Sequence, residues 1–515
     1  MLFSSWKFLC LFLPLTLAVF FLLPARVGMA RKGGLLLASF VFYGAWKISA
    51  LPLLCGSILF NFWVGEFLVR WKDQPRARLL IIFGVLCNLG VLGYYKYAGF
   101  TVGILQAITQ RSFVMPQIIL PLAISFFTFT QIAYIIDVYR DHTRHYRFWD
   151  YVLFVVMFPH LIAGPIVRHW EIIPQYTGKE MRPSLADLHT GTILFLMGLF
   201  KKVLIADPLA VNANAIYDAA ANGVTPTFFD GWFGTLCYAL QLYFDFSGYS
   251  DMAIGLARMF GIRFPCNFNS PYRSLSISEF WSRWHITLTR FLREYVYFPL
   301  GGNRAGEWTH LRNIMAVMLL SGLWHGAGWT FVCWGGLHGI YLVIASLWKK
   351  LRKDSTAAFF EGGAYRWLCG SLTFFVVLLA WVLFRAKDFP TAGRIYASMC
   401  GVHAFTVPYK VGEAKLAIGK ITSLLGGVIV PDTIGGISYR FTILSMLALL
   451  LVVWACPNSQ QLLARFQPIL EEVKSPSRWQ PRFGILAGLL FGTGLFFVFR
   501  SFFAAQESPF LYFNF

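Results

Sequence analysis

Charged side chains are scarce in this sequence. Only 13% of its 515 residues are Asp, Glu, Lys or Arg, whereas roughly 25% is usual for a soluble domain. Hydrophobic residues make up 57% of the chain and aromatic residues 18%, which excludes an ordinary soluble fold. The composition predicts a polytopic integral membrane protein whose spanning elements are α-helices.

Several catalytic and ligand-binding motifs are also missing. The sequence has no nucleotide-binding glycine loop, no GxSxG nucleophile elbow, no internal repeat and no low-complexity tract. Its nine cysteines show no CxxC spacing, so neither a disulfide framework nor a zinc site is indicated. Most of them lie in or beside apolar segments, where cysteine acts as a small core residue.

Acidic residues are outnumbered, with 24 Asp and Glu against 44 Lys and Arg, for a net charge of +20. Such an excess can indicate nucleic-acid binding, but here the basic residues occupy short loops between apolar runs, as the positive-inside rule describes. We therefore expect no nucleic-acid partner. The loops at 26–32, 70–78 and 140–147 are predicted to be cytoplasmic, and 212–230, which lacks Lys and Arg, is predicted to be periplasmic.

Apolar runs that approach the length of a membrane helix occur along most of the chain. They lie at 8–24, 34–48, 51–69, 78–98, 118–138, 151–166, 190–209, 231–244, 248–262, 312–325, 328–348, 367–385, 440–456 and 483–503. The first resembles a signal peptide in length, but further membrane segments follow it, so a retained helix is expected. We expect a single integral membrane domain with N-terminal helices in 1–150, a catalytic core in 151–348 and C-terminal helices in 349–515.

One histidine stands out because it lies in an apolar run from about residue 314 to 347. The tight stretch 321–327 places His325 there. Ionisable groups are costly inside a bilayer, so this imidazole must face protein or a water-filled cavity. His325 is therefore the first candidate for chemistry, and the residues around it are expected to form the site.

Two further histidines flank the first along the chain. His285 follows Arg283 and Trp284 in an aromatic and charged stretch, and it is expected to join His325 at one site. His338 lies thirteen residues beyond His325, which would place it on a different face of a straight helix. We assign His338 a helix-packing role with a hydrogen bond to a neighbouring helix.

Two carboxylates, Asp245 and Asp251, lie in a nearly apolar segment. Buried carboxylates need hydrogen bonds or cations, because an unpaired buried charge costs several kcal/mol. The sequence offers these candidate partners: Ser247, Tyr249, Arg283 and Arg304. A structural ion-pair network is favoured over a direct catalytic role for the two carboxylates.

Two irregular stretches are expected near the site. Residues 158–168 contain two prolines and a glycine, which predicts a re-entrant or kinked element that lines a cavity. Between 263 and 312, arginines exceed acidic residues, which suits a phosphate-bearing ligand but equally a cytoplasmic loop. One face of an amphipathic interfacial helix is predicted there, formed by Phe280, Trp284, Thr287, Leu288 and Phe291.

Four motifs in order carry a family resemblance. They are YFDFSGYSD at 243–251, FWSRWH at 280–285, LGGNR at 300–304 and GLWHG at 322–326. With them the chain resembles the membrane-bound O-acyltransferase family, in particular its bacterial polysaccharide O-acetylation branch. Ser282 and Ser321 stand where that branch is expected to have arginine and glycine, which leaves alginate, cellulose and other exopolysaccharides open as the polymer.

The resemblance implies an all-α bundle of tilted transmembrane helices with re-entrant elements around a central funnel. It places the family's membrane-embedded histidine on His325 and its loop-borne histidine on His285. His325 would be a general base, a role typically worth about 10² to 10⁴ in rate, and His285 would orient the donor or stabilise the oxyanion. The supporting or substrate-lining residues would be Trp324, Trp284, Arg283, Asn303, Arg304, Asp245, Ser247, Tyr249 and Asp251.

The same resemblance implies the reaction partners. Acetyl-CoA would be the cytoplasmic acyl donor, with no permanently bound cofactor and no metal. A periplasmic or membrane-anchored acetyltransferase would accept the acetyl group and modify an exopolysaccharide. The protein would then be a multi-pass protein of the bacterial inner membrane.

Two other classes of function remain open at the level of the residues. A transporter or channel would use His285, His325, Asp245 and Asp251 as a proton relay, but the symmetric half-repeats that favour this class are not found. A histidine metal site would need an HxxxH spacing or a close carboxylate, and the sequence offers neither.

Overall fold

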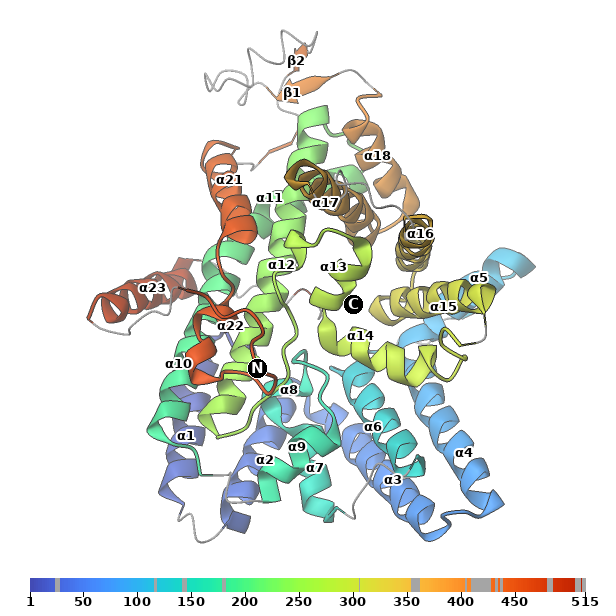
Figure 1. Ribbon diagram of the computed structural model, residues 1–515, viewed down its shortest axis with the longest axis vertical. Helices are drawn as coiled ribbons and strands as arrows, with labels where there is room; N and C mark the ends of the chain where they lie inside the picture. Colours follow the sequence, from blue (N-terminus) through green and yellow to red (C-terminus); the bar gives the residue numbers. More distant parts are fainter. Residues whose placement is uncertain are drawn as a thin grey trace. The chain divides into compact units, whose positions relative to one another are not determined.

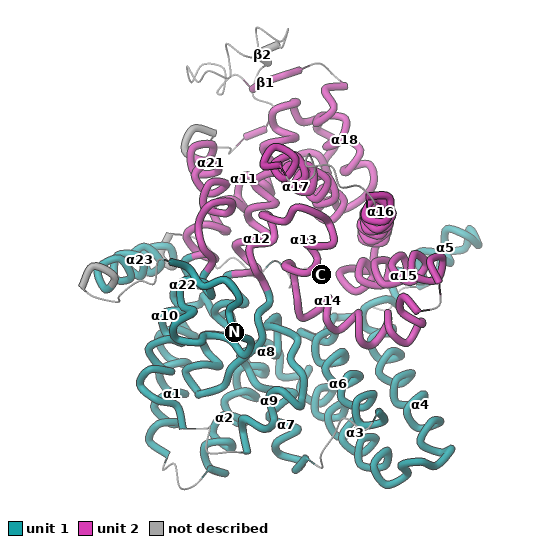
Figure 2. Tube along the Cα trace, in the orientation of Figure 1, with its two compact units in different colours: residues 1–200, 248–267, 459–515 teal, residues 201–247, 268–458 magenta. Residues whose placement is uncertain are grey.

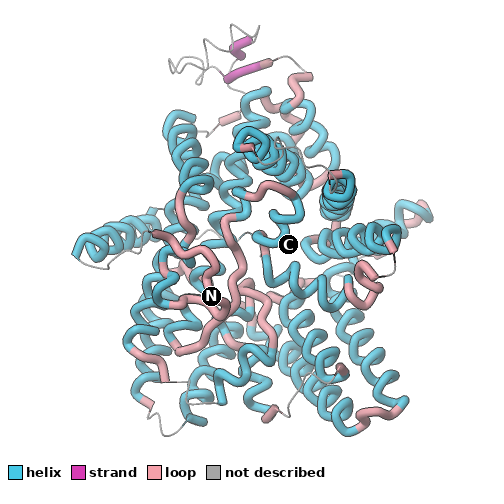
Figure 3. Tube along the Cα trace, in the orientation of Figure 1, coloured by secondary structure: helices cyan, strands magenta, loops and turns pink. Residues whose placement is uncertain are grey.

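The computed structural model describes most of the chain (Figure 1). The described residues are 1–23, 28–114, 118–140, 146–177, 182–304, 306–352, 362–402, 405–408, 428–430, 434–435, 439–478, 485–504 and 511. Among them, the regular elements are helices except for two short strands, β1 (Thr406–Pro408) and β2 (Val428–Val430), which pair in parallel (Figure 3). The prediction of an all-α membrane protein is confirmed.

Four described helices are long and apolar enough to cross a membrane. They are Ile48–Arg70, Pro75–Thr109, Trp329–Leu351 and Gly363–Arg385. Shorter apolar helices lie at Phe8–Leu22, Ile124–Tyr139, Thr442–Ala455 and Gly488–Ser501. In helices all backbone hydrogen bonds are made within the segment, which is the condition for crossing a bilayer. A multi-pass membrane protein follows from these segments.

The described chain forms two compact units (Figure 2). Unit 1 contains residues 1–200, 248–267 and 459–515. Its elements are η1 (Phe8–Phe12), α1 (Leu13–Leu22), α2 (Gly28–Gly44), η2 (Ile48–Ala50), α3 (Leu51–Arg70), α4 (Pro75–Leu92), η3 (Gly93–Tyr97), α5 (Ala98–Thr109), α6 (Ile124–Tyr139), α7 (Phe148–Val156), α8 (Phe158–Leu161), α9 (His169–Thr177), α10 (Leu185–Phe200), α22 (Ser459–Leu462), η8 (Ala464–Phe466) and α23 (Ile485–Ala504).

Unit 2 contains residues 201–247 and 268–458. Its elements are η4 (Lys201–Ala206), α11 (Asp207–Ala221), η5 (Pro271–Arg273), α13 (Ile277–Arg283), α14 (Ile286–Leu292), η6 (Arg293–Tyr297), α15 (Glu307–His325), α16 (Trp329–Leu351), α17 (Gly363–Arg385), α18 (Phe389–Met399), the two strands and α21 (Tyr439–Ala455). All three histidines singled out in the sequence belong to this unit.

One helix, α12 (Phe228–Met259), contributes residues to both units. The sequence predicted two segments here, 231–244 and 248–262, and this was wrong, because a single helix of 32 residues runs through the polar stretch between them. Within unit 1, its glycines allow close helix packing: a Cβ atom on Gly255 would lie 2.6 Å from the carbonyl oxygen of Gly191 on α10. Small residues at such contacts are typical of membrane helices.

The expected interfacial helix is broken in two. α13 ends at Arg283 and α14 starts at Ile286, and between them His285 adopts a left-handed conformation with φ 43°. Ser276 caps α13 by accepting a hydrogen bond from the backbone N–H of Glu279 at 3.2 Å. The prediction of one continuous helix is therefore wrong. Its five face residues are nonetheless all buried, since both short helices turn the same residues inward.

The stretch 158–168 is irregular, as predicted. It contains the four-residue helix α8 and then non-helical backbone, and residues 158–167 are buried in unit 1. Ser39 on α2 accepts a hydrogen bond from the N–H of Phe158 at 3.2 Å. A Cβ atom on Gly164 would lie 2.5 Å from Cα of His160, so glycine is required at this approach. That the stretch lines a cavity stays a prediction.

The predicted membrane orientation and the division at residues 150 and 348 also stay predictions. Parts of the loops on which the orientation depends, 24–27 and 141–145, lie outside the described residues. So does most of 403–438, where the sequence offered no interpretation.

Candidate active site

A tight helical hairpin positions His325. It is the last residue of α15, and α16 begins four residues later at Trp329, after the extended residues Gly326 and Gly328. The two helices approach so closely that a Cβ atom on Gly322 would lie 3.2 Å from Cα of Gly335. This packing buries the imidazole of His325 to 2% exposure.

The ring of His325 is surrounded by aromatic side chains. Its centroid lies 4.9 Å from that of Trp324, 5.2 Å from that of Trp334 and 5.2 Å from that of Phe384. Trp334 in turn stacks on Trp381 of α17 at 5.9 Å with an interplanar angle of 18°. These rings and those of the two neighbouring histidines form what we call the aromatic layer, defined by His285, Trp324, His325, Trp334, His338, Trp381 and Phe384.

His285 reaches the same layer from the junction of α13 and α14. Its ring lies 5.9 Å from Trp324 and 4.7 Å from Phe246 of α12, in an edge-on contact. The side chain is fully buried, and burial lowers its pKa to about 3. The imidazole is therefore neutral near pH 7. Trp324 lies between the two histidines that the sequence analysis expected at one site.

His338 joins the layer through Trp334, with a ring separation of 4.9 Å. Its Nδ1 accepts a hydrogen bond from Nε1–H of Trp281 on α13 at 3.3 Å. The helical-wheel argument assumed one straight helix, but the chain reverses between α15 and α16, so His325 and His338 both contact the ring of Trp334. The hydrogen bond agrees with the packing role assigned to His338, and that role stays a prediction.

Polar atoms of this hairpin that are buried without a hydrogen-bond partner among the described residues include Ser321 Oγ, Trp334 Nε1 and His338 Nε2. Burying an unpaired polar group costs free energy, so native proteins keep few of them. A catalytic role is one reason for keeping such an atom. Trp334, which the sequence analysis did not single out, therefore enters the candidate site as a hydrogen-bond donor beside His325.

Asp245 is held by a cation that the sequence analysis missed. Nζ of Lys202 on η4 lies 2.8 Å from a carboxylate oxygen of Asp245 and 2.6 Å from one of Asp207. The expected partners Arg283 and Arg304 were wrong for this carboxylate, because Arg283 pairs with Glu279 at 2.7 Å and Arg304 is exposed before the start of α15. The sequence does contain a signal for this ion pair, because Lys201 and Lys202 lie inside the apolar run 190–209, where a cation needs an acidic partner.

The remaining carboxylate is fixed within unit 1. Asp251 accepts hydrogen bonds from Oγ of Ser459 and Nε2 of Gln460, both at 2.6 Å. Tyr249, two residues earlier, stacks on Phe3 with a centroid separation of 4.7 Å. These contacts join α12 to both ends of the chain and support a structural role for Asp251 and Tyr249. Ser247, on the other side of Gly248, is buried in unit 2.

The glycine turn 300–304 is not beside His325. Asn303 and Arg304 are exposed at the start of α15, and about 27 Å of helix separates that end from His325 at 1.5 Å per residue. The turn is held by Asn313, whose Nδ2 donates to the carbonyl oxygens of Leu300 and Gly302, both at 3.0 Å. The structure therefore brings His285 and Trp324 into the layer, packs Trp284 against Trp381 of the layer at 5.1 Å, and leaves Asn303 and Arg304 elsewhere.

Fold and site together define a class: a helical membrane protein whose histidines lie buried among tryptophans in its interior. Residues 139–385, which include the whole aromatic layer, match MBOAT, the membrane-bound O-acyltransferase family. The chain is 37% identical to the peptidoglycan O-acetyltransferase of Helicobacter pylori, over 100% of this chain and 98% of that protein. It is 44% identical to the probable alginate O-acetylase of Azotobacter vinelandii, over 82% and 83% of the two chains.

The chain belongs to the membrane-bound O-acyltransferase family and is an acyltransferase. This confirms the resemblance read from the four motifs and sets aside the transporter or channel. A more distant relative, the teichoic acid D-alanyltransferase of Bacillus subtilis, is 27% identical over 52% of this chain and 69% of its own. The names of these relatives share acyl transfer but differ in acyl group and polymer.

Proposed function

We propose that this protein moves acetyl groups from cytoplasmic acetyl-CoA across the bacterial inner membrane for O-acetylation of an exopolysaccharide. A periplasmic or membrane-anchored acetyltransferase of the same pathway receives the acetyl group. The observation that carries the proposal is His325, buried at the end of α15 between two tryptophans, within the range that matches the acyltransferase family.

His325 acts as the general base. The acceptor hydroxyl oxygen attacks the thioester carbonyl carbon while its proton passes to the imidazole, which gives a tetrahedral oxyanion. The carbon–sulfur bond then breaks, the ester carbonyl forms again, and the protonated His325 returns the proton to the leaving thiolate. Histidine suits both steps because its unperturbed pKa, near 6.5, lies close to neutral pH.

Two neighbouring groups suit the oxyanion. His285 is neutral at pH 7, so one of its ring nitrogens carries a proton that can be donated, and Trp324 separates it from His325. Trp334 Nε1–H is a buried donor that has no protein acceptor among the described residues. Donors that are fixed in a water-poor site stabilise developing charge without reorganisation. The surrounding rings exclude water that would hydrolyse the thioester.

Burial supports a relay rather than direct polymer modification. His325 is 2% exposed and His285 is fully buried, so a polysaccharide chain does not fit beside either ring in this structure. An acetyl group on a slender carrier is small enough to approach. This size difference supports the proposal that a second protein takes the acetyl group to the polymer.

The polymer is proposed from the relatives. The alginate O-acetylase of A. vinelandii has the higher identity, 44%, over 432 residues, which favours an exopolysaccharide such as alginate or cellulose. The second candidate is peptidoglycan, because the H. pylori relative matches this chain along its whole length at 37% identity. To distinguish the two, exopolysaccharide and peptidoglycan are isolated from cells with and without the gene. The polymer that loses ester-linked acetate when the gene is absent is the substrate.

The test of the reaction uses purified protein in detergent and radiolabelled acetyl-CoA. We expect transfer of the acetyl group to an acceptor in added membrane extract, without any ion gradient and unaffected by a protonophore. His325→Gln should abolish this activity in folded protein. The proposal fails if the wild type leaves labelled acetyl-CoA intact in the presence of membrane extract that contains the acceptor, or if the variant retains the rate.

A further inference from the structure

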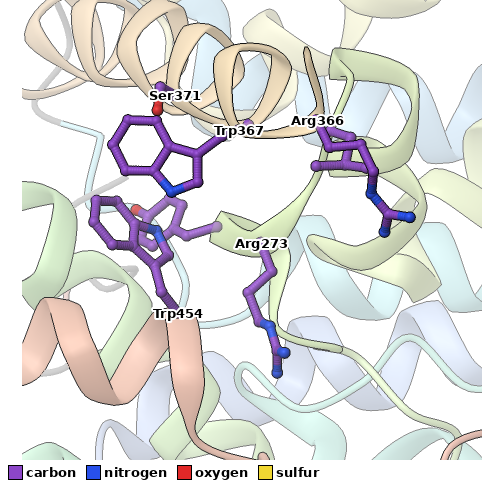
Figure 4. A pocket seen from close by; sticks show the side chains of 8 residues that line it. Arg273, Arg366, Trp367, Ser371 and Trp454 are labelled. Carbon is purple, nitrogen blue, oxygen red and sulfur yellow. The ribbon is translucent and has the colours of Figure 1, made fainter. Parts of the chain in front are cut away.

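A pocket of about 220 Å³ lies in unit 2 apart from the aromatic layer (Figure 4). It is lined by Tyr272, Arg273, Leu275, Arg366, Trp367, Gly370, Ser371 and Trp454. These residues come from η5 and the segment after it, from the first three turns of α17 and from the last turn of α21. In Figure 4 the indoles of Trp367 and Trp454 lie on one side of the opening and the two arginines on the other.

The lining carries positive charge and no carboxylate. Arg273 and Arg366 are both exposed, and neither has an ion-pair partner among the described residues. Guanidinium groups bind phosphate oxygens with paired hydrogen bonds, and arginine is preferred over lysine for this geometry. The pocket therefore has the electrostatics of a phosphate-binding site.

The wall that carries Arg273 is fixed by hydrogen bonds. The hydroxyl of Tyr272 donates to the carbonyl oxygen of Ala239 at 2.8 Å and accepts from Nε1–H of Trp381 at 3.2 Å. Nδ2 of Asn458, just beyond α21, donates to Oγ of Ser270 at 3.1 Å. These bonds hold η5 in place before a ligand binds. Binding at Arg273 therefore does not cost the conformational entropy of ordering this segment.

The surface next to the pocket is apolar and exposed, which favours a lipid over a soluble phosphate. On α17, a candidate membrane span, Trp367 is 75% exposed, Leu368 60% and Leu372 58%. On the apolar helix α21, Trp454 is 41% exposed and Leu451 67%. Tryptophans at the ends of apolar helices mark the membrane interface. A ligand here meets cations at one end and a hydrocarbon surface at the other.

We propose that this pocket binds an anionic phospholipid, with its phosphate at Arg273 and Arg366 and its glycerol and upper acyl chains against Trp367 and Trp454. The basic end of α16, with Lys349 and Lys350, precedes α17 in the sequence and places the pocket in the cytoplasmic leaflet by the positive-inside rule. The site is independent of the acetyl-transfer reaction and of the polymer.

Native mass spectrometry of the full chain in detergent, with phosphatidylglycerol or phosphatidylcholine added, tests this site. We expect wild type to retain one phosphatidylglycerol in preference to phosphatidylcholine. The pair Arg273→Gln and Arg366→Gln should weaken that binding roughly tenfold to thirtyfold, since each basic residue near an anionic surface contributes about fivefold. Lys349→Gln removes an exposed cation outside the lining and should bind like wild type.

A second arm separates a lipid from a free phosphate compound. Trp367→Ala should weaken phosphatidylglycerol binding, because the acyl chains lose a wall. Millimolar inorganic pyrophosphate should leave the bound lipid in place. The proposal is overturned if wild type binds both lipids equally, if the double variant keeps the preference, or if pyrophosphate displaces the lipid and Trp367→Ala has no effect. Size-exclusion profiles confirm that each variant is folded.

Discussion

The two ends of α15 carry histidines in opposite settings. Near its start, His310 has both ring nitrogens within hydrogen-bonding distance of a hydroxyl, Tyr297 at 2.6 Å and Ser346 at 3.2 Å. At its end, His325 is packed against the rings of Trp324, Trp334 and Phe384. Both residues are histidines on the same helix. We infer from these settings that His310 is a structural histidine held between two hydroxyls and that His325 is the candidate for proton transfer.

The same contrast applies to charged and indole groups in unit 2. Lys202 is buried between two carboxylates, and Trp381 Nε1–H is bonded to Tyr272, whereas Trp334 Nε1–H has no acceptor among the described residues. We therefore expect changes at Lys202 and Trp381, whose polar groups are paired, to alter stability, and a change at Trp334 to alter turnover. The following predictions test this separation, from the largest expected effect to the smallest.

Lys202→Met should have the largest effect, on stability. The side chain of Lys202 is 5% exposed, and removing one partner of a buried ion pair costs about 3–5 kcal/mol because the other charge stays buried. We expect most of the protein to be lost from the membrane. Lys387→Met removes an ion pair to Asp218 that is 62% and 49% exposed, and it should cost at most about 1 kcal/mol. Equal abundance of the two variants would contradict this assignment.

Trp334→Phe should lower turnover at nearly unchanged stability. It keeps a ring against His325 but removes a donor that has no protein acceptor, so transfer per folded molecule should fall roughly tenfold or more if that donor serves the oxyanion. Trp381→Phe is the matched variant, because it removes a paired indole N–H and should cost about 1 kcal/mol of stability instead. Initial rates and apparent melting temperatures of both variants are the measurement. A loss of stability in Trp334→Phe together with a loss of turnover in Trp381→Phe would contradict this prediction.

His285 should make stability depend on pH. Its folded pKa is about 3, lowered by burial, while its unfolded pKa is about 6.5. Below pH 6.5 the unfolded chain binds a proton that the folded chain does not, so this contribution to stability is complete above pH 6.5 and is lost as pH falls, by at most about 1.4 kcal/mol per unit. His285→Gln should melt with a shallower pH dependence between pH 5 and 7. Parallel curves for both proteins would exclude the effect.

Much of the fold could be predicted from periodicity and apolar length. The runs around Trp329–Leu351 and Gly363–Arg385 became helices within a few residues of the expected bounds. The continuity of α12 could not be predicted in this way, because Asp245 and Asp251 interrupt the apolar pattern and their partners are not known from the sequence. Those partners, such as Lys202, lie far away in the sequence, and apolar patterns carry no information on such pairs.

For the site, local motifs predicted that His285 and His325 lie near each other, and the structure places both rings against Trp324, at 5.9 and 4.9 Å. Trp334 was missed because its nearness to His325 depends on the reversal of the chain at Gly326 and Gly328, and a single-helix argument places it elsewhere. Arg304 was expected at the same site because it lies in a motif. The two motifs lie at opposite ends of α15, so the length of this helix separates Arg304 from His325.

The most direct test of the account compares His325→Gln with His310→Gln. Both changes keep polarity and nearly the same volume, on one helix. We predict that acetyl transfer per folded molecule falls by about 10² or more for His325→Gln, the loss expected for a general base. His310→Gln should keep a rate close to wild type and lose thermal stability instead. A wild-type rate for His325→Gln, or an equal loss in both variants, would contradict the assignment of His325 as the base.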